Sequence, residues 1–195
     1  KDKKKEFAKE IFGVFKPKIH VAKKIGKWEK TSTFGDVFID DDYLLGFSNA
    51  YFGIVSKKFG YSGQDVGLIL MDVYKLLDGT YSDLDKFQKI IQNYQSAKSS
   101  GSKDLILGED HALMFFLVFT SDNDAHKFSK DPIYKDANKY FETGEFKKQS
   151  DWAKKFLPEE FSNSNTLSDA PSNIIVAYRI FEQTFEKRLN KLFKI

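Results

Sequence analysis

Apolar residues recur every three or four positions along almost the whole chain, which is the spacing of one face of an α-helix. The clearest example lies between Ser62 and Asp78, where Ser62 is placed to cap the helix and Gly79 to end it. Its apolar face consists of Val66, Ile69, Leu70, Val73, Tyr74 and Leu77. Because a strand would instead alternate apolar and polar residues, this spacing predicts an all-α fold.

The same spacing predicts further helices, over residues 7–15, 19–25, 43–59, 82–95, 110–120, 132–144, 146–157 and 171–194. Thr31 to Ile39 is the one stretch with an extended alternative, which would add at most one minor β-hairpin. The run of Ser, Lys and Gly at residues 96–103 is typical of a linker, and would be the flexible connection if the protein has two helical lobes. We therefore expect a single-domain multi-helix bundle of about seven to nine helices that spans residues 1–195.

Phenylalanine dominates the apolar residues, with 20 Phe against 15 Leu in 195 residues. Since leucine is usually the commonest core residue, we expect a Phe-rich core in which rings pack edge to face or offset.

The chain has no cysteine, which excludes disulfides, thiol nucleophiles and thiolate metal sites. The longest uninterrupted apolar run, Ala112 to Phe119, is eight residues, whereas a transmembrane helix needs about 20. We expect no transmembrane segment and a cytoplasmic location.

Charge is unevenly distributed along the chain. Residues 1–30 hold eleven Lys against four acids, whereas residues 31–85 hold three Lys against nine acids. Two interpretations remain open: the basic segment binds an anionic partner, or the two segments attract each other within the fold. Only Arg179 and Arg188 are arginine, and lysine lacks the planar fork that reads guanine, so sequence-specific base recognition is disfavoured.

The basic N-terminal segment also contains aromatic residues, and this combination is the main positive signal for binding. A basic amphipathic segment can bind an anionic membrane or follow a nucleic-acid backbone, although its lysines can also be a solvated face over a helix whose rings enter the core. The candidate binding residues are Lys3, Lys4, Lys5, Lys9, Lys23, Lys24, Lys27 and Trp28.

Common reaction signatures are missing from the sequence. It has no phosphate-binding loop, no Gly-x-Ser-x-Gly nucleophile motif and no His-Glu-x-x-His zinc motif. The acids Asp40 to Asp42 could bind Mg²⁺, but capping of the next helix is the simpler interpretation. Near the apolar run of residues 112–119, folding could bring together a carboxylate and histidine metal site from Asp110, His111, Asp122, Asp124 and His126.

These observations favour a non-enzymatic helical interaction protein, such as a regulator, inhibitor or adaptor that binds a protein partner. We predict no cofactor, and the sequence identifies neither the partner nor a catalytic residue. The long apolar stripe of residues 171–194 would also suit a homodimer seam. The alternatives are a metal-dependent enzyme that uses the Asp and His residues above, and a binder of an anionic membrane or nucleic acid through the lysine-rich N-terminus.

Overall fold

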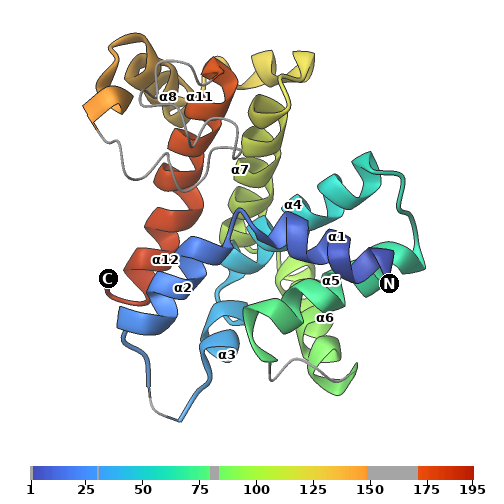
Figure 1. Ribbon diagram of the computed structural model, residues 1–195. Coiled ribbons are helices and arrows are strands. Elements are labelled where there is room, and N and C mark those ends of the chain that lie inside the picture. The colour runs from blue at the N-terminus through green and yellow to red at the C-terminus, as the bar shows by residue number, and fades with distance from the viewer. Residues whose placement is uncertain (1, 30, 80–83, 149–170) are drawn as a thin grey trace. The chain divides into compact units, whose positions relative to one another are not determined.

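Aspartate side chains begin several helices by accepting hydrogen bonds from backbone N–H groups that have no partner within the helix. In the computed structural model, Asp41 Oδ1 accepts from the N–H of Leu44 at 3.0 Å, and Asp131 Oδ1 accepts from the N–H of Ile133 at 2.8 Å. The structure describes residues 2–29, 31–79, 84–148 and 171–195 (Figure 1). These residues form helices, turns and loops without a β-strand, which confirms the predicted all-α multi-helix bundle.

The helices follow one another along the described residues as shown in Figure 1. They are α1 (Lys3–Phe12), α2 (Lys16–Ile25), α3 (Phe34–Ile39), α4 (Asp42–Lys58), α5 (Gln64–Leu77), α6 (Leu84–Ser99), α7 (Lys103–Phe119), the 3-10 helix η2 (Asn123–Phe128), α8 (Pro132–Glu142), the 3-10 helix η3 (Glu145–Lys148), α11 (Ser172–Phe181), the π-helix η5 (Glu182–Glu186) and α12 (Lys187–Leu192). None of these described helices is both long and apolar enough to cross a membrane.

The chain divides into two compact units. The first comprises Lys1–Ala112 and Lys187–Ile195, and the second comprises Leu113–Glu186. The break therefore falls within α7, and not at residues 96–103. There α6 continues to Ser99 and α7 begins at Lys103, so that only a short turn joins the two helices. The single domain over residues 1–195 stays a prediction.

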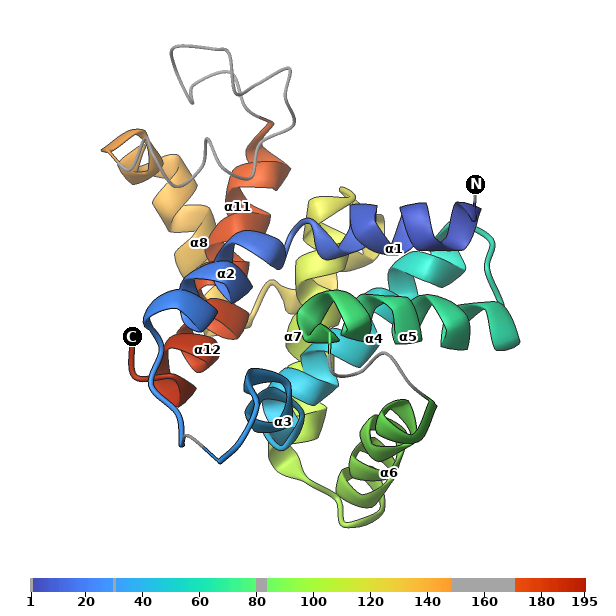
Figure 2. The same cartoon turned by 60° about the horizontal axis from the view of Figure 1, so that its bottom comes forward.

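In the first unit, α4 is the central helix. It contacts α3, α5, α6 and α12, while α1 lies along α5 (Figure 2). Phe15, which follows α1 and precedes α2 in the chain, is 1% exposed, and its ring packs against three rings of α4. The ring-centroid distances are 6.0 Å to Phe47, 5.2 Å to Tyr51 and 4.8 Å to Phe52. The predicted aromatic core is thus confirmed in this unit.

Two glycines allow α4 and α7 to cross with their backbones in contact. A Cβ atom at Gly46 would lie 2.4 Å from the carbonyl oxygen of Leu105. A Cβ atom at Gly108 would lie 2.3 Å from the carbonyl oxygen of Tyr43 and 2.9 Å from the backbone nitrogen of Phe47. Only glycine fits at either position, because both obstructing groups are backbone.

Helix α12 is attached to the first unit through Arg188. Its guanidinium donates to both oxygens of Asp41, from Nε to Oδ1 at 3.2 Å and to Oδ2 at 2.9 Å, and its Nη2 donates to Asp104 Oδ2 at 2.8 Å. The side chain of Asp41 is only 8% exposed. Asp42 accepts from Ser102 Oγ at 2.6 Å. Capping and ion pairing therefore account for Asp41 and Asp42, as the simpler of the two sequence interpretations proposed.

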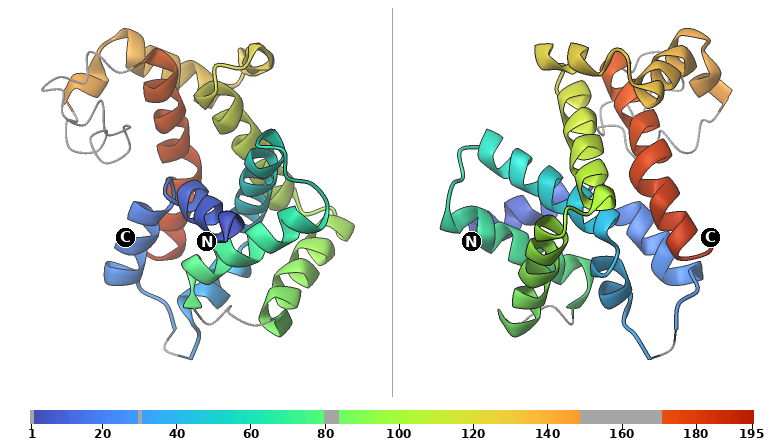
Figure 3. Two further views of the ribbon diagram at one scale, coloured as in Figure 1. Left: turned by 45° about the vertical axis from the view of Figure 1, so that its right-hand side comes forward. Right: turned by 180° about the vertical axis from the view of Figure 1, so that it is seen from behind.

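The second unit has its own aromatic cluster, between α7 and α11. Phe181 lies 5.4 Å from Phe115 and stacks on Phe185 at 5.1 Å, and Tyr178 meets Phe119 edge to face at 6.1 Å. Helix α8 packs beside α11, as the orange and red ribbons of Figure 3 show. Phe115, Phe181 and Phe185 are thus buried, at 0% exposed, among helices of the same unit.

Some local predictions were wrong. The stretch with the extended alternative contains helix α3, because Thr33 caps it: Thr33 Oγ1 accepts from the N–H of Asp36 at 3.1 Å. Gly63, at φ +50°, occupies the N-cap position of helix α5, and the predicted hydrogen bond from a Ser62 side-chain cap is not formed.

Predictions for the last third of the chain have mixed outcomes. The helix predicted at residues 146–157 lies largely outside the described residues. The predicted C-terminal helix is interrupted by the π-helix η5, where Thr184 Oγ1 donates to the carbonyl of Ile180 at 2.6 Å. Most of its apolar stripe is buried within the chain, including Phe181 and Leu189 at 0% exposed. The homodimer through this helix stays a prediction.

Because of Tyr74, the unfolding free energy should depend on pH in the alkaline range. Its hydroxyl donates to Asn49 Oδ1 at 2.8 Å, and burial raises the pKa of Tyr74 well above its usual value. Burial also raises the pKa of Tyr178. Since the unfolded chain loses these protons near pH 10 and the folded chain keeps them, the unfolding free energy is fully retained below pH 10 and falls above it, by up to about 1.4 kcal/mol per pH unit for each group.

We expect Tyr74→Phe to separate the contribution of the Tyr74 hydrogen bond from that of its ionisation. At pH 8 the variant should lose about 1 kcal/mol, because Asn49 loses its hydrogen-bond donor. Between pH 10 and pH 11.5 its unfolding free energy should fall less steeply than that of the wild type. Urea unfolding at pH 8, 10.5 and 11.5 measures both effects, and equal slopes for the two proteins would show that Tyr74 ionises as readily folded as unfolded.

Candidate functional site

The N-terminal helices bury one face and leave their lysines outside. Helix α1 ends near Gly13, and α2 begins one turn later with Pro17 in its first turn, where the missing N–H of proline costs nothing. The two helices bury apolar side chains against the first unit while most of their lysines stay exposed. The buried side chains are Phe7, Ala8, Ile11, Phe12, Ile19 and Ala22.

A groove of about 410 Å³ lies along these two helices and α5. Its floor is apolar, formed by Phe12, Ile19 and Leu76, and Leu76 is 37% exposed. Its rim is cationic. We call this the basic groove, defined by Lys9, Phe12, Lys16, Ile19, His20, Lys23 and Leu76.

No acidic residue lines the basic groove among the described residues. Lys9 forms one exposed ion pair with Glu6, at 3.5 Å, and Lys23 donates to the carbonyl of Leu77 while lying 5.3 Å above the ring of Phe34. Within the described part of the chain, the structure gives Lys16 no ionic partner. The rim therefore carries positive charge that the lining itself does not neutralise.

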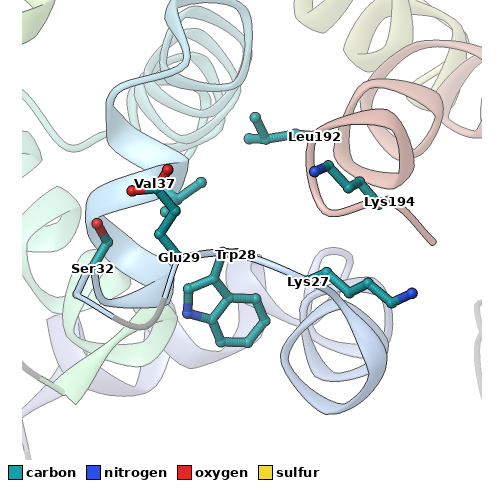
Figure 4. A pocket seen from close by; sticks show the side chains of 7 residues that line it. All are labelled: Lys27, Trp28, Glu29, Ser32, Val37, Leu192 and Lys194. Atoms are coloured by element: carbon teal, nitrogen blue, oxygen red, sulfur yellow. The ribbon is translucent and has the colours of Figure 1, made fainter.

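A second pocket of the first unit, about 450 Å³, surrounds Trp28. Trp28 meets Phe34 and Phe193 edge to face, at 5.7 and 5.6 Å. Figure 4 shows the remaining lining side chains around the indole, with Lys27 extending away from it. The Trp28 pocket is lined by Lys27, Trp28, Glu29, Ser32, Val37, Leu192 and Lys194. The lining has two lysines, Lys27 and Lys194, and the charge of Glu29 offsets one of them. Because the indole also packs against core rings, this pocket is the weaker candidate for binding an anion.

The eight predicted binding residues are therefore divided. Two of them, Lys9 and Lys23, line the basic groove, and two others, Lys27 and Trp28, line the Trp28 pocket. The other four line neither and are Lys3, Lys4, Lys5 and Lys24.

Lys4 forms an ion pair within the fold, as expected if the basic and acidic segments of the chain attract each other. Its ammonium lies 2.6 Å from Asp65, and this hydrogen-bonded ion pair raises the pKa of Lys4. The pair joins α1 to α5, that is, the basic segment to the acidic segment that follows it. One of the predicted binding lysines is thus engaged within the fold.

Sequence reasoning omitted Lys16 and His20 from the candidate residues. A signal for them exists in the spacing: Lys9, Lys16 and Lys23 are seven residues apart, and Phe12 and Ile19 follow the first two lysines by three. Such a repeat places the lysines and the apolar residues along one side of consecutive helices. Leu76 has no comparable signal, because it comes from α5 and joins the groove only through tertiary packing.

Three residues of the alternative metal site, His111, Asp122 and His126, lie within hydrogen-bond distance of other groups of the protein. His111 is buried, and its Nδ1 lies 2.7 Å from the hydroxyl of Tyr43. Asp122 caps η2 by accepting from the N–H of Asp124 at 3.0 Å, and His126 Nδ1 lies 2.6 Å from the carbonyl of Asn123.

Asp110 is exposed and precedes the break between the two compact units, whereas Asp122, Asp124 and His126 follow it. Among the described residues, no three His, Asp or Glu side chains are grouped so that they could hold a metal ion.

Comparison of the chain with protein-family models, with curated proteins and with solved structures gave no match.

Proposed function

We propose that this chain is a helical interaction protein whose basic groove binds an acidic amphipathic segment of a protein partner. The observation that carries the proposal is an apolar floor beneath a cationic rim that contains no acid among its described lining residues. Protein partners commonly dock an amphipathic helix into such a groove through apolar side chains spaced three or four residues apart. Acidic residues flanking these side chains would then face the lysines of the rim.

The shape of the groove favours a protein segment over a membrane. A helix that lies on a membrane exposes its apolar face, which enters the lipid, while its cationic face lies toward the headgroups and water. Here the buried Phe12 and Ile19 form the floor and the exposed lysines form the rim, so a ligand must bring its own apolar side chains into the groove. The groove volume of about 410 Å³ is in the range of ligand-sized pockets.

The direct test uses a fluorescein-labelled helical peptide with leucines at positions i, i+3 and i+7 and glutamates between them. We expect anisotropy titrations to show binding that weakens steeply as salt rises from about 50 to 300 mM, because exposed charges are screened over about a Debye length. The matched peptide with glutamine in place of glutamate should bind much more weakly.

We expect the double variant Lys9→Gln/Lys16→Gln to bind the acidic peptide about fivefold to tenfold more weakly, since each rim charge contributes up to about 1 kcal/mol. The matched control is Lys3→Gln/Lys5→Gln. Both doubles lower the net charge by two and each removes one exposed ion pair near the start of the chain, Lys9–Glu6 or Lys5–Asp2. Equal weakening by the two doubles would mean that the peptide responds to net charge alone, which contradicts the proposal.

The floor is tested by Leu76→Ser with Leu68→Ser as its control. Both leucines lie on α5, at 37% and 39% exposed, but only Leu76 lines the groove. We expect Leu76→Ser to weaken peptide binding and Leu68→Ser to leave it unchanged.

Two further ligands test the competing classes: vesicles that contain phosphatidylserine, and a duplex oligonucleotide. If either of them binds, loses affinity in the Lys9/Lys16 double variant and is not replaced by the acidic peptide, the groove serves that ligand and the proposal is overturned.

A further inference from the structure

The second unit contains a pocket that the proposed function does not use. It has a volume of about 380 Å³ and lies where α7 ends and α11 begins, beside η2 and α8. We call it the acidic pocket, and it is lined by Val118, Ser121, Asp122, Ala125, Tyr134, Asn138, Phe141, Glu142, Ser172, Asn173 and Val176.

A tight turn fixes the position of Asp122 in this pocket. The N–H of Asp122 donates to the carbonyl of Leu117 at 2.9 Å, and the N–H of Ser121 donates to the carbonyl of Val118 at 3.1 Å. These two bonds end α7 as a Schellman motif, with Ser121 at φ +53° in the left-handed position where glycine is usual. Asp122 then caps η2, so its carboxylate is held by the turn that precedes it and the helix that follows it.

The amide side chains in the lining leave acceptors for a ligand. Asn138 Nδ2 donates to the carbonyl of Tyr134 at 3.0 Å, and Asn173 Nδ2 donates to the carbonyl of Phe119 at 2.7 Å. Each of these bonds uses the donor side of the amide, and the Oδ1 atom remains an acceptor. Together with the carboxylates of Asp122 and Glu142, these amide oxygens give the lining four side chains with acceptors for a cation, beside the hydroxyls of Ser121, Tyr134 and Ser172, which can donate or accept.

The charge of the pocket is also of one sign. Asp122 and Glu142 are acidic, and no Lys, Arg or His is among the described lining residues. Helices α7 and α8 end in the lining, whereas η2 and α11 begin there, so the helix ends contribute partial charges of both signs and the two carboxylates set the sign of the pocket. A bound anion would face both carboxylates, so the electrostatics select a cation.

Two aromatic residues, Tyr134 and Phe141, line the same pocket. Aromatic faces attract organic cations and also contact their alkyl groups. A hydrated metal ion gains little from such walls, and no metal-binding group of three His, Asp or Glu side chains occurs in the described part of the chain. We propose that the acidic pocket binds a small organic cation, an alkylammonium or a guanidinium group, either as a free amine or as a lysine or arginine side chain.

The proposal is tested by NMR titration of the ¹⁵N-labelled protein with three probes of similar size: n-butylammonium, ethylguanidinium and butyrate. We expect the two cations to shift the amide resonances of residues that line the acidic pocket, with a Kd of about the millimolar range, and butyrate to leave them unchanged. Butyrate binding as tight as n-butylammonium binding would overturn the proposal, because the pocket would then recognise only the alkyl chain.

The carboxylates are tested with Asp122→Asn/Glu142→Gln, which removes both charges while the amide oxygen introduced at position 122 can still cap η2. We expect this double variant to bind n-butylammonium at least about tenfold more weakly. The matched control is Asp124→Asn, next to the pocket but not in its lining, which should bind as the wild type does. The single variant Glu142→Gln, at an exposed position, keeps the test valid if the double variant does not fold. Unchanged cation binding in Glu142→Gln and in the double variant would overturn the proposal.

The two sources of the cation are separated by the blocked tripeptide acetyl-Ala-Lys-Ala-amide. Tighter binding of the tripeptide than of n-butylammonium supports a protein side chain as the natural ligand, and weaker binding supports a free amine. Absence of binding by both probes overturns the proposal. Because the acidic pocket and the basic groove share no lining residue, the failure of one proposal leaves the other unaffected.

Discussion

Gly108→Ala should be among the most destabilising single substitutions in the first unit. The added methyl group would lie 2.3 Å from the carbonyl oxygen of Tyr43 and 2.9 Å from the backbone nitrogen of Phe47. Neither atom can move away by a change of rotamer, so α4 and α7 must separate. Overpacking in a core usually costs about 1–3 kcal/mol, and a clash between two backbones should reach or exceed the upper end. We expect Tm to fall by roughly 6–12 °C, measured by circular dichroism.

Helix α4 provides both a second variant and a control for this prediction. Gly46→Ala should destabilise the protein to a similar extent, because its methyl group would lie 2.4 Å from the carbonyl oxygen of Leu105. Gly53 lies two turns further along α4, and a methyl group there would have no neighbouring atom within 4 Å. Gly53→Ala should therefore stabilise the protein by about 0.5–1 kcal/mol through helix propensity alone. If Gly46→Ala stabilised the protein as Gly53→Ala does, α4 and α7 would not cross as closely as described.

Arg188→Met should produce the second large effect. The substitution keeps an unbranched side chain but leaves the carboxylate of Asp41, 8% exposed, without its cationic partner. Desolvation alone would lower the pKa of Arg188, but its hydrogen bonds to Asp41 and the charge of Asp104 raise it overall, so the guanidinium is bound in its charged form. Removing one partner of a buried ion pair typically costs about 3–5 kcal/mol, and since Arg188 is partly exposed we expect about 2–4 kcal/mol. Urea unfolding measures this loss.

A double-mutant cycle identifies the cause of the loss. Asn in place of Asp41 can still accept the hydrogen bond that caps α4, but it carries no charge. We therefore expect Asp41→Asn in the Arg188→Met background to recover about 1–2 kcal/mol. Arg188→Lys should fall between wild type and Arg188→Met, because lysine keeps the charge but cannot contact Asp41 and Asp104 through two separate N–H groups of one planar guanidinium. No recovery in the double variant would assign the loss to the packing of the Arg188 side chain instead.

Most helices and the aromatic character of the core could be predicted from the sequence. Apolar residues at helical spacing fix which side of a helix is buried, whatever it is buried against, and this was enough to place α4, α5, α8 and α11. The start of α8 is also set locally, since Asp131 caps the helix and Pro132 lies in its first turn, so that both act on the adjacent backbone. Errors occurred where two neighbouring residues could cap the same helix, as with Ser62 and Gly63, because the choice depends on the backbone conformation and not on residue type.

The candidate sites could be predicted only in part. The lysines of α1 and α2 were visible as a basic segment, but nothing in the local sequence separates Lys9, which lines the groove, from Lys4, which is paired with Asp65. That distinction depends on which residues of α5 each lysine meets. The acidic pocket was not predicted, because its lining comes from four elements and its polarity depends on which side of each amide is already hydrogen-bonded.

The sequence by itself therefore determined the helical class, the aromatic core and the basic character of the N-terminal segment, because these follow from interactions within a few residues. Tertiary structure alone decided that Gly46 and Gly108 meet a facing helix backbone, that Arg188 pairs with Asp41 147 positions away, and that Leu76 completes the basic groove. The physical reason is that helical periodicity specifies a face but not the partner of that face. Partner choice is set by packing and charge pairing between segments that are distant in the chain.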